Sequence, residues 1–158
     1  MLSVYSVDRK CGCSTASLAK GCSEFVVQWV LKWLDQMHFE NIVLWTDQEV
    51  SVKAIADRVK KGSRFFVDVQ EAPIHSHQAM GGVERYHRQI QELMRVLKIG
   101  LETNIGADLP AKLPLVSWLV RHSAWLLHRF RVPIATGQTS FVAVSGVTYE
   151  RAMVEFGE

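Results

Sequence analysis

Two carboxylates stand where this chain could hold a metal ion. Asp47 follows the apolar run "NIVLWT", and the carboxyl ends of strands are where open α/β sheets bind ligands. Glu84 comes 37 positions later, separated from Gly81 and Gly82 by Val83 alone, at the expected start of a helix. Carboxylate oxygens are the ligands that hard divalent cations prefer, and two such cations can drive phosphoryl transfer. The simpler alternative is that Asp47 caps the next helix and Glu84 complements its helix dipole.

The helix expected from Val83 to about Thr103 carries basic and amide side chains on the same face as Glu84. At about 100° per residue, this face spans an arc of about 80° and contains Glu84, Arg88, Gln91, Arg95 and Lys98. A separate apolar stripe is expected to pack on a sheet, and it consists of Val83, Ile90, Met94, Leu97 and Leu101. An acid followed by basic groups suits a metal site with phosphate contacts leading away from it. A solvated face with a Glu84–Arg88 ion pair is the alternative.

The remaining pattern predicts a mixed three-layer α/β domain. Strands are expected at 2–7, 13–20, 41–47 and 64–70, with residues 8–10 and Gly12 forming the turn of a hairpin. Helices are expected at 24–38 after the N-cap Ser23, at 48–62 with Gly62 as its C-cap, and at 113–130. Residues 73–82 are expected to be a loop, and the tail is expected to be irregular with a short helix. The unbroken apolar run Ile42–Trp45 favours a strand covered on both faces.

The composition limits the class of protein but does not indicate a function. The chain has 158 residues, 48% of them hydrophobic, and a formal net charge of +2, which suits one domain with a sizeable core. Its three cysteines form no CxxC pair, so we expect reduced thiols in an intracellular protein. We expect them to be small buried or half-buried strand residues, and metal binding by the Cys11-Gly12-Cys13 stretch is the alternative. No apolar run reaches the roughly 20 residues that span a bilayer. A zinc site at His75, His77 and His87 is a weaker alternative.

The stretches "LWTDQE" and "HSHQAMGGVERYHRQIQ" resemble the catalytic core of retroviral and retrotransposon integrases. Further stretches are similar to other parts of that family, namely "VDRKCGC" to an early hairpin, "WLVRHSAWLLHRFRV" to the last long helix, and "GQTSF…SGVTYERAMVEFGE" to a copia-like extension. The resemblance implies an RNase H-like fold, with a core at 1–131 and an extension at 132–158. It also implies a segment of a larger polyprotein encoded by a transposable element.

By this resemblance Asp47 is the second acid and Glu84 the third acid of the family's D,D(35)E triad, since 36 residues lie between them. The resemblance implies a site for two Mg²⁺ or Mn²⁺ ions that supports 3′-end processing and strand transfer. The implied partners are double-stranded DNA, as element ends and target, and further copies of the chain, with nuclear localisation during integration. Gln78 and Gly81 match the family's loop that contacts DNA, and the helix face adds Arg88, Gln91, Arg95 and Lys98.

The chain also departs from the family's pattern. We expect the family's first strand, which carries the first acid, to be missing, because Asp8 does not align with the triad position. Met80 stands where the family usually has Asn or Gln, and His128 replaces a usual Asn. We therefore expect no strand transfer from this segment alone. The alternatives are a non-catalytic nucleic-acid-binding or interaction remnant of the same fold, and an RNase H-like nuclease.

Overall fold

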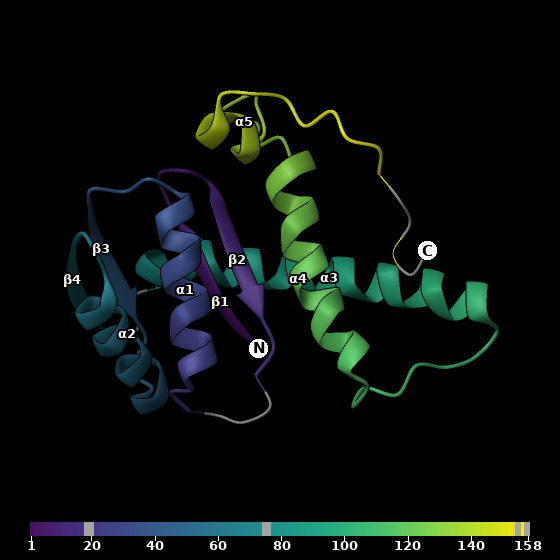
Figure 1. Cartoon of the computed structure of the whole chain (residues 1–158), viewed down its shortest axis with the longest axis horizontal. Coiled ribbons are helices and arrows are strands. Elements are labelled where there is room, and N and C mark those ends of the chain that lie inside the picture. Colours follow the sequence, from purple (N-terminus) through teal and green to yellow (C-terminus); the bar gives the residue numbers. More distant parts are fainter. Residues whose placement is uncertain (18–20, 74–76, 154–155, 157–158) are drawn as a thin grey trace. The chain divides into compact units, whose positions relative to one another are not determined.

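The computed structural model describes residues 1–17, 21–73, 77–153 and 156. Figure 1 shows its elements, which follow in chain order: β1 (Leu2–Ser6), β2 (Cys11–Thr15), α1 (Glu24–Gln36), β3 (Asn41–Thr46), α2 (Val50–Gly62), β4 (Phe66–Glu71), α3 (His77–Ile105), α4 (Pro114–Phe130) and α5 (Ser140–Ser145). This order of strands and helices is the predicted one. The residues form two compact units. We call residues 17–82 the parallel-strand unit, and residues 1–16 with 83–158 the hairpin unit.

In the parallel-strand unit, α1 begins where the sequence predicts. The Ser23 hydroxyl accepts a hydrogen bond from the Val26 N–H at 3.3 Å, which satisfies one of the free donors at the helix start. The buried face of α1 consists of Val26, Val27, Val30, Trp33 and Leu34. Helical periodicity places Phe25 on this face as well, but it is exposed. Local capping and helical periodicity therefore define this helix, with one error at its first turn.

Strands β3 and β4 pair in parallel, from Asn41 opposite Phe66 to Thr46 opposite Glu71. The prediction that the Ile42–Trp45 run is covered on both faces was wrong. Val43 is 52% exposed and Trp45 is 44% exposed, whereas Thr46 is buried. The reason is that β3 and β4 form a two-stranded sheet on which α2 packs. Side chains alternate between the faces of a strand, so an apolar run does not reveal whether both faces are covered.

Gly62 is not the left-handed C-cap that the sequence predicts. It is the last residue of α2, and the helix ends at Ser63 in an extended conformation. A Cβ atom at Gly62 would lie 2.9 Å from Leu31 Cδ1 of α1. The absence of a side chain therefore lets α2 approach α1 closely, and its role is packing between helices.

In the hairpin unit, β1 and β2 pair antiparallel from Leu2 opposite Thr15 to Ser6 opposite Cys11. The turn occupies residues 7–10, where Lys10 has a positive φ of 51°. Gly12 was expected in this turn but lies within β2. A Cβ atom there would be 2.5 Å from the Val4 carbonyl oxygen and 2.7 Å from Tyr86 Cε1. Gly12 thus serves the close approach of the Tyr86 ring to the hairpin.

Every residue of β2 is buried, and α4 packs on this strand (Figure 1). Cys11 and Cys13 are buried free thiols in β2, which confirms the prediction for these two residues. Cys22 is partly exposed and lies outside the strands, just before α1. Burial raises the pKa of the Cys11 thiol to about 12, although the positive charge of Arg9 acts against this rise. Both buried cysteines therefore act as small apolar residues.

Helix α3 begins earlier than predicted, at His77 instead of Val83, and it ends at Ile105. Residues 73–82 are therefore only partly a loop. Glutamine, alanine and methionine at 78–80 have high helix propensity, and the helix continues through Gly81 and Gly82 although each glycine costs about 1 kcal/mol. The helix ends at Gly106, which has a positive φ of 67° and donates its N–H to the Glu102 carbonyl. Glu84 consequently lies about two turns inside α3.

The tail contains the short helix that the sequence predicts, and aromatic contacts hold it on α4. The Arg129 guanidinium carbon lies 4.4 Å from the ring centre of Trp125, 5.1 Å from Phe141 and 5.2 Å from Tyr149. The neighbouring His128 is partly buried, and its pKa falls to about 4 because this burial, and then the charge of Arg129, disfavour the protonated ring. Cation–π contacts therefore fasten the 140–149 segment to α4. The boundary at residue 131 stays a prediction.

The contact between Gly12 and Tyr86 can be tested with two alanine substitutions. Gly12→Ala would place a methyl group against the Val4 carbonyl and the Tyr86 ring, so we expect a loss of about 1–3 kcal/mol in the free energy of unfolding. Gly100→Ala is the matched control, because no atom lies within 4 Å of a Cβ at this helical position. We expect it to stabilise the protein by about 0.5–1 kcal/mol.

Chemical unfolding followed by circular dichroism would measure both changes. A Gly12→Ala variant as stable as the unmodified protein would contradict the close packing of Tyr86 on β2.

Candidate functional site

Asp47 lies at the carboxyl end of β3, as the sequence predicts, and its side chain is exposed. Its Oδ1 accepts a hydrogen bond from the Glu49 N–H at 3.2 Å. The N-cap position of α2 belongs to Glu49, which makes no side-chain capping bond. The alternative in which Asp47 caps α2 therefore does not describe this turn. A carboxylate has about four acceptor positions, so Asp47 keeps oxygen lone pairs for a cation.

Glu84 is also exposed, but its surroundings differ from the predicted ones. It was expected in the first turn of its helix, whereas α3 already begins at His77. The helix dipole acts mainly within the first turn, so it does not account for an acid at this position. Within the described part of the chain, Glu84 forms no ion pair with Arg88 or with another cation. Its carboxylate is therefore available to a ligand.

The juxtaposition of the two acids stays a prediction, because Asp47 belongs to the parallel-strand unit and Glu84 to the hairpin unit. Among the described residues, no three His, Cys, Asp or Glu side chains gather as a metal site. Asp68, a weaker candidate ligand on β4, accepts a hydrogen bond from the Gln70 side chain at 2.7 Å. The structure thus provides two accessible carboxylates, each described within its own unit.

The polar face of α3 is largely the predicted one. Arg88, Gln91 and Arg95 are exposed, as Glu84 is. The apolar stripe faces inward, with Ile90 and Leu101 buried. The periodicity analysis missed Tyr86, which is buried in a core cluster with Ile90, Val120 and Ala124. Burial of this stripe leaves the opposite side of α3 to carry charged groups in solvent.

Lys98 is the exception on this face. Its ammonium forms an ion pair with Glu102 one turn further on. Glu102 also accepts the Leu109 N–H at 2.6 Å, and the bonds from Lys98 and Leu109 lower the pKa of its carboxyl group. Lys98 is therefore less free to contact a phosphate than Arg88 or Arg95, and its role in DNA binding stays a prediction.

Gln78 and Gly81 were expected in a loop that contacts DNA. Both belong to the first turns of α3, so the predicted loop geometry was wrong at these positions. The side chain of Gln78 and all of His75 lie outside the described residues. A role for either position in DNA binding stays a prediction.

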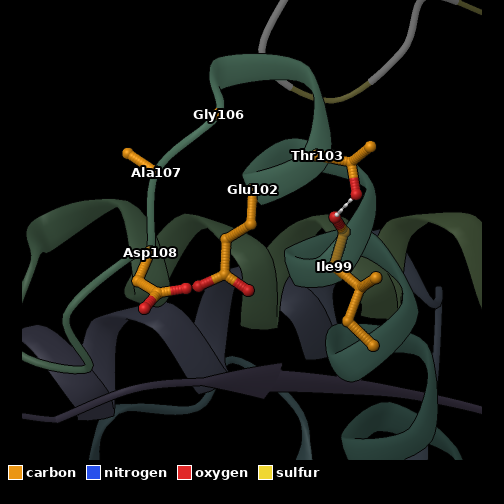
Figure 2. A pocket seen from close by; sticks show the side chains of 6 residues that line it. All are labelled: Ile99, Glu102, Thr103, Gly106, Ala107 and Asp108. Carbon is orange, nitrogen blue, oxygen red and sulfur yellow. Dashed lines mark hydrogen bonds between the residues drawn. The ribbon is translucent and has the colours of Figure 1, made fainter.

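An open hollow of about 420 Å³ lies at the opposite end of α3 from Glu84 (Figure 2). Its lining consists of Ile99, Glu102, Thr103, Gly106, Ala107 and Asp108. Figure 2 shows the Glu102 and Asp108 carboxylates turned toward one another. Glu84 lies about 27 Å away along the helix axis. The hollow is therefore separate from the candidate site, and its acidic lining does not suit a nucleic acid.

A hydrogen-bonded group next to Glu84 could not be recognised from the sequence. The Ser3 hydroxyl oxygen lies 2.7 Å from Ser14 Oγ and 3.1 Å from His87 Nδ1. Burial, and then the positive charge of the chain's amino terminus, lower the pKa of His87. A histidine that binds a metal commonly makes a hydrogen bond with its other ring nitrogen, so this contact does not decide the zinc alternative. That alternative stays a prediction, because His75 and the side chain of His77 lie outside the described residues. No local motif signals a contact between residues 84 positions apart.

Comparison with known proteins supports the fold but gives no family assignment from sequence. No family model matches the chain, and no curated protein matches it. Among solved structures, the chain is similar to the crystal structure of the catalytic core domain of BIV integrase, with a TM-score of 0.60 and 13% sequence identity. The match covers 90% of this chain and 82% of that chain.

None of the helices in the described ranges is long and apolar enough to cross a membrane. The expected mixed α/β architecture is present, with four strands and five helices among the described residues, and it matches a solved integrase core over most of its length. The chain therefore has the RNase H-like fold of an integrase catalytic core.

Proposed function

We propose that this chain is an integrase-type catalytic core segment that binds double-stranded DNA along the exposed face of α3. The observation that carries the proposal is the order of groups on that face. The free carboxylate of Glu84 comes first, followed by the exposed Arg88, Gln91 and Arg95. The similarity to a solved integrase core supports the same role. We further propose that the chain belongs to a copia-like retrotransposon. Its integration would take place in the nucleus, and several copies of the chain would assemble.

The DNA-binding part of the proposal depends on simple electrostatics. Two guanidinium groups about two turns apart on one helix face can each contact a phosphate, and each contact releases condensed counterions. Gln91 lies between Arg88 and Arg95 on this face and can donate a hydrogen bond to a phosphate or a sugar. Such contacts position a duplex without reading its sequence. They suit a protein that must accept many target sequences.

The metal-binding part depends on Asp47 and Glu84. Both are exposed, and neither forms an ion pair with another described residue, so each supplies oxygen donors of the kind that Mg²⁺ or Mn²⁺ prefers. When bound, such ions activate water or a DNA 3′-hydroxyl and stabilise the leaving oxygen. In the intact protein this chemistry would support end processing and strand transfer. With two carboxylates, we expect weak metal binding and no strand transfer from these 158 residues.

The competing proposals make different predictions about these two parts. A non-catalytic remnant would bind nucleic acid through Arg88 and Arg95 but would not need Asp47 or Glu84. An RNase H-like nuclease would need the acids and would cleave a nucleic-acid strand without joining DNA ends. Measuring DNA binding and metal binding separately therefore distinguishes the remnant from the enzymes.

The exposed arginines can be replaced without disturbing the core. In Arg88→Gln/Arg95→Gln, helix propensity stays high, so folding should be unchanged while two phosphate contacts are lost. We expect the affinity for duplex DNA to fall about tenfold at low salt, and the log–log salt slope to shrink by about two units. Fluorescence anisotropy of a labelled duplex over a salt series would measure both quantities.

Lys60→Gln/Lys61→Gln is the control, since it removes the same charge from the last turn of α2. We expect a smaller loss of affinity and little change in slope. Equal losses in the two double variants would mean that the attraction is diffuse and that the α3 face has no special role.

Glu102→Gln tests whether Lys98 is held away from DNA by its ion pair. The glutamine amide oxygen can still accept the Leu109 N–H, but the attraction for the Lys98 ammonium is lost. We expect duplex affinity to rise about threefold and the salt slope to grow by about one unit. Anisotropy titrations of Glu102→Gln, Lys98→Gln and the double variant would measure the effect.

Glu92→Gln is the matched control, because it removes one exposed acid from the same helix without releasing Lys98. An equal gain in Glu92→Gln, or a gain that persists when Lys98 is also replaced, would show that only net charge matters.

The metal site can be tested with Mn²⁺ alone. Asp47→Asn and Glu84→Gln each remove one anionic ligand while keeping nearly the same shape, so each should weaken Mn²⁺ binding about tenfold or more. Electron paramagnetic resonance of free Mn²⁺ would measure the dissociation constants. Asp57→Asn, at an exposed position on α2, should leave them unchanged. Unchanged binding in Asp47→Asn or Glu84→Gln would favour the non-catalytic remnant.

A further inference from the structure

We propose that His87 is a positioning residue for Glu84, acting through its hydrogen bond to Ser3. This inference rests on the proposed metal-binding role of Glu84. The three polar groups form a continuous chain in the hairpin unit, from Ser14 Oγ to Ser3 Oγ at 2.7 Å and from Ser3 Oγ to His87 Nδ1 at 3.1 Å. Ser14 is completely buried. These two hydrogen bonds thus join β2, β1 and α3.

The position of His87 on α3 gives the hydrogen bond its effect on Glu84. The two residues are three positions apart, so they lie on neighbouring turns of the helix. His87 points toward the hairpin, whereas Glu84 points to solvent. Because a helix is stiff over a single turn, fixing the orientation of the helix at His87 also fixes the direction of the Cα–Cβ bond of Glu84, from which its carboxylate extends.

The neighbouring contacts cannot set this rotation as closely. The Tyr86 ring packs with its centre 5.5 Å from that of Tyr5 and covers Gly12. Apolar contacts of this kind are non-directional, so they hold α3 on the hairpin but tolerate a small rotation about the helix axis. A hydrogen bond weakens steeply as its geometry departs from the favoured one. We infer that the Ser3–His87 bond adds a directional constraint on the rotation of this part of α3 to the constraint from packing.

Side-chain chemistry provides a matched pair of variants. The amide of asparagine can occupy the place of the histidine Nδ1, whereas the longer glutamine places its amide near the former Nε2. His87→Asn should therefore keep the bond to Ser3, and His87→Gln should lose it. Groups that orient a metal ligand typically change metal affinity by about tenfold or more. We expect His87→Gln and Ser3→Ala to weaken Mn²⁺ binding about tenfold, and His87→Asn to keep it within about twofold of the unmodified protein.

The experiment measures Mn²⁺ dissociation constants by electron paramagnetic resonance for these three variants, for Ser3→Ala/His87→Gln and for Glu84→Gln. Thermal unfolding followed by circular dichroism confirms that each protein is folded at the temperature of the titration. If the two residues act through one hydrogen bond, the double variant should bind Mn²⁺ no more weakly than either single variant. A general loss of stability would not be rescued by His87→Asn.

Three outcomes would overturn the proposal. Mn²⁺ binding that falls in Glu84→Gln but not in His87→Gln or Ser3→Ala would remove the positioning role and leave the proposed metal site intact. Equal losses in His87→Asn and His87→Gln would mean that the ring itself matters, and not the bond from Nδ1. Unchanged binding in Glu84→Gln would overturn both the positioning role and the proposed role of Glu84.

Discussion

The architecture of the hairpin unit depends on the close approach of α3 to a strand of small residues. Gly12 leaves room for the Tyr86 ring, and the other residues of β2 are small enough to be completely covered. Tyr86 and Ile90 pack there with Val120 and Ala124 of α4. One strand thus supports two helices. A larger side chain in the middle of β2 would push α3 outward, together with every group on its exposed face.

This packing divides α3 into two sides with different roles. The inward side supplies apolar area to the core, so the outward side is free to hold charged groups in solvent. Glu84, Arg88, Gln91 and Arg95 occupy that outward side, and they form the candidate metal and DNA-binding surface. Lys98 belongs to the same arc but is paired with Glu102. The usable basic surface is therefore shorter than helical periodicity alone implies.

The similarity to an integrase core and the residues of the candidate site support the proposed function in different ways. At 13% identity, the match establishes a shared fold, and a fold can carry many functions. The functional argument comes from the two free carboxylates and the arginines that follow Glu84 on one helix face. Asp47 and Glu84 lie in separate units. Their joint action in metal binding therefore stays a proposal.

The sequence by itself determined the features that depend on neighbours within a few residues. The order of elements, the Ser23 cap, the buried and exposed sides of α3 and the short helix in the tail all follow from local hydrogen bonds and periodicity. The tertiary structure decided what approaches each element from elsewhere. Gly12 and Gly62 lie where another element packs too closely for a side chain. Val43 and Trp45 are exposed, and Ser3 is hydrogen-bonded to His87. These outcomes depend on contacts between distant parts of the chain, which no local pattern encodes.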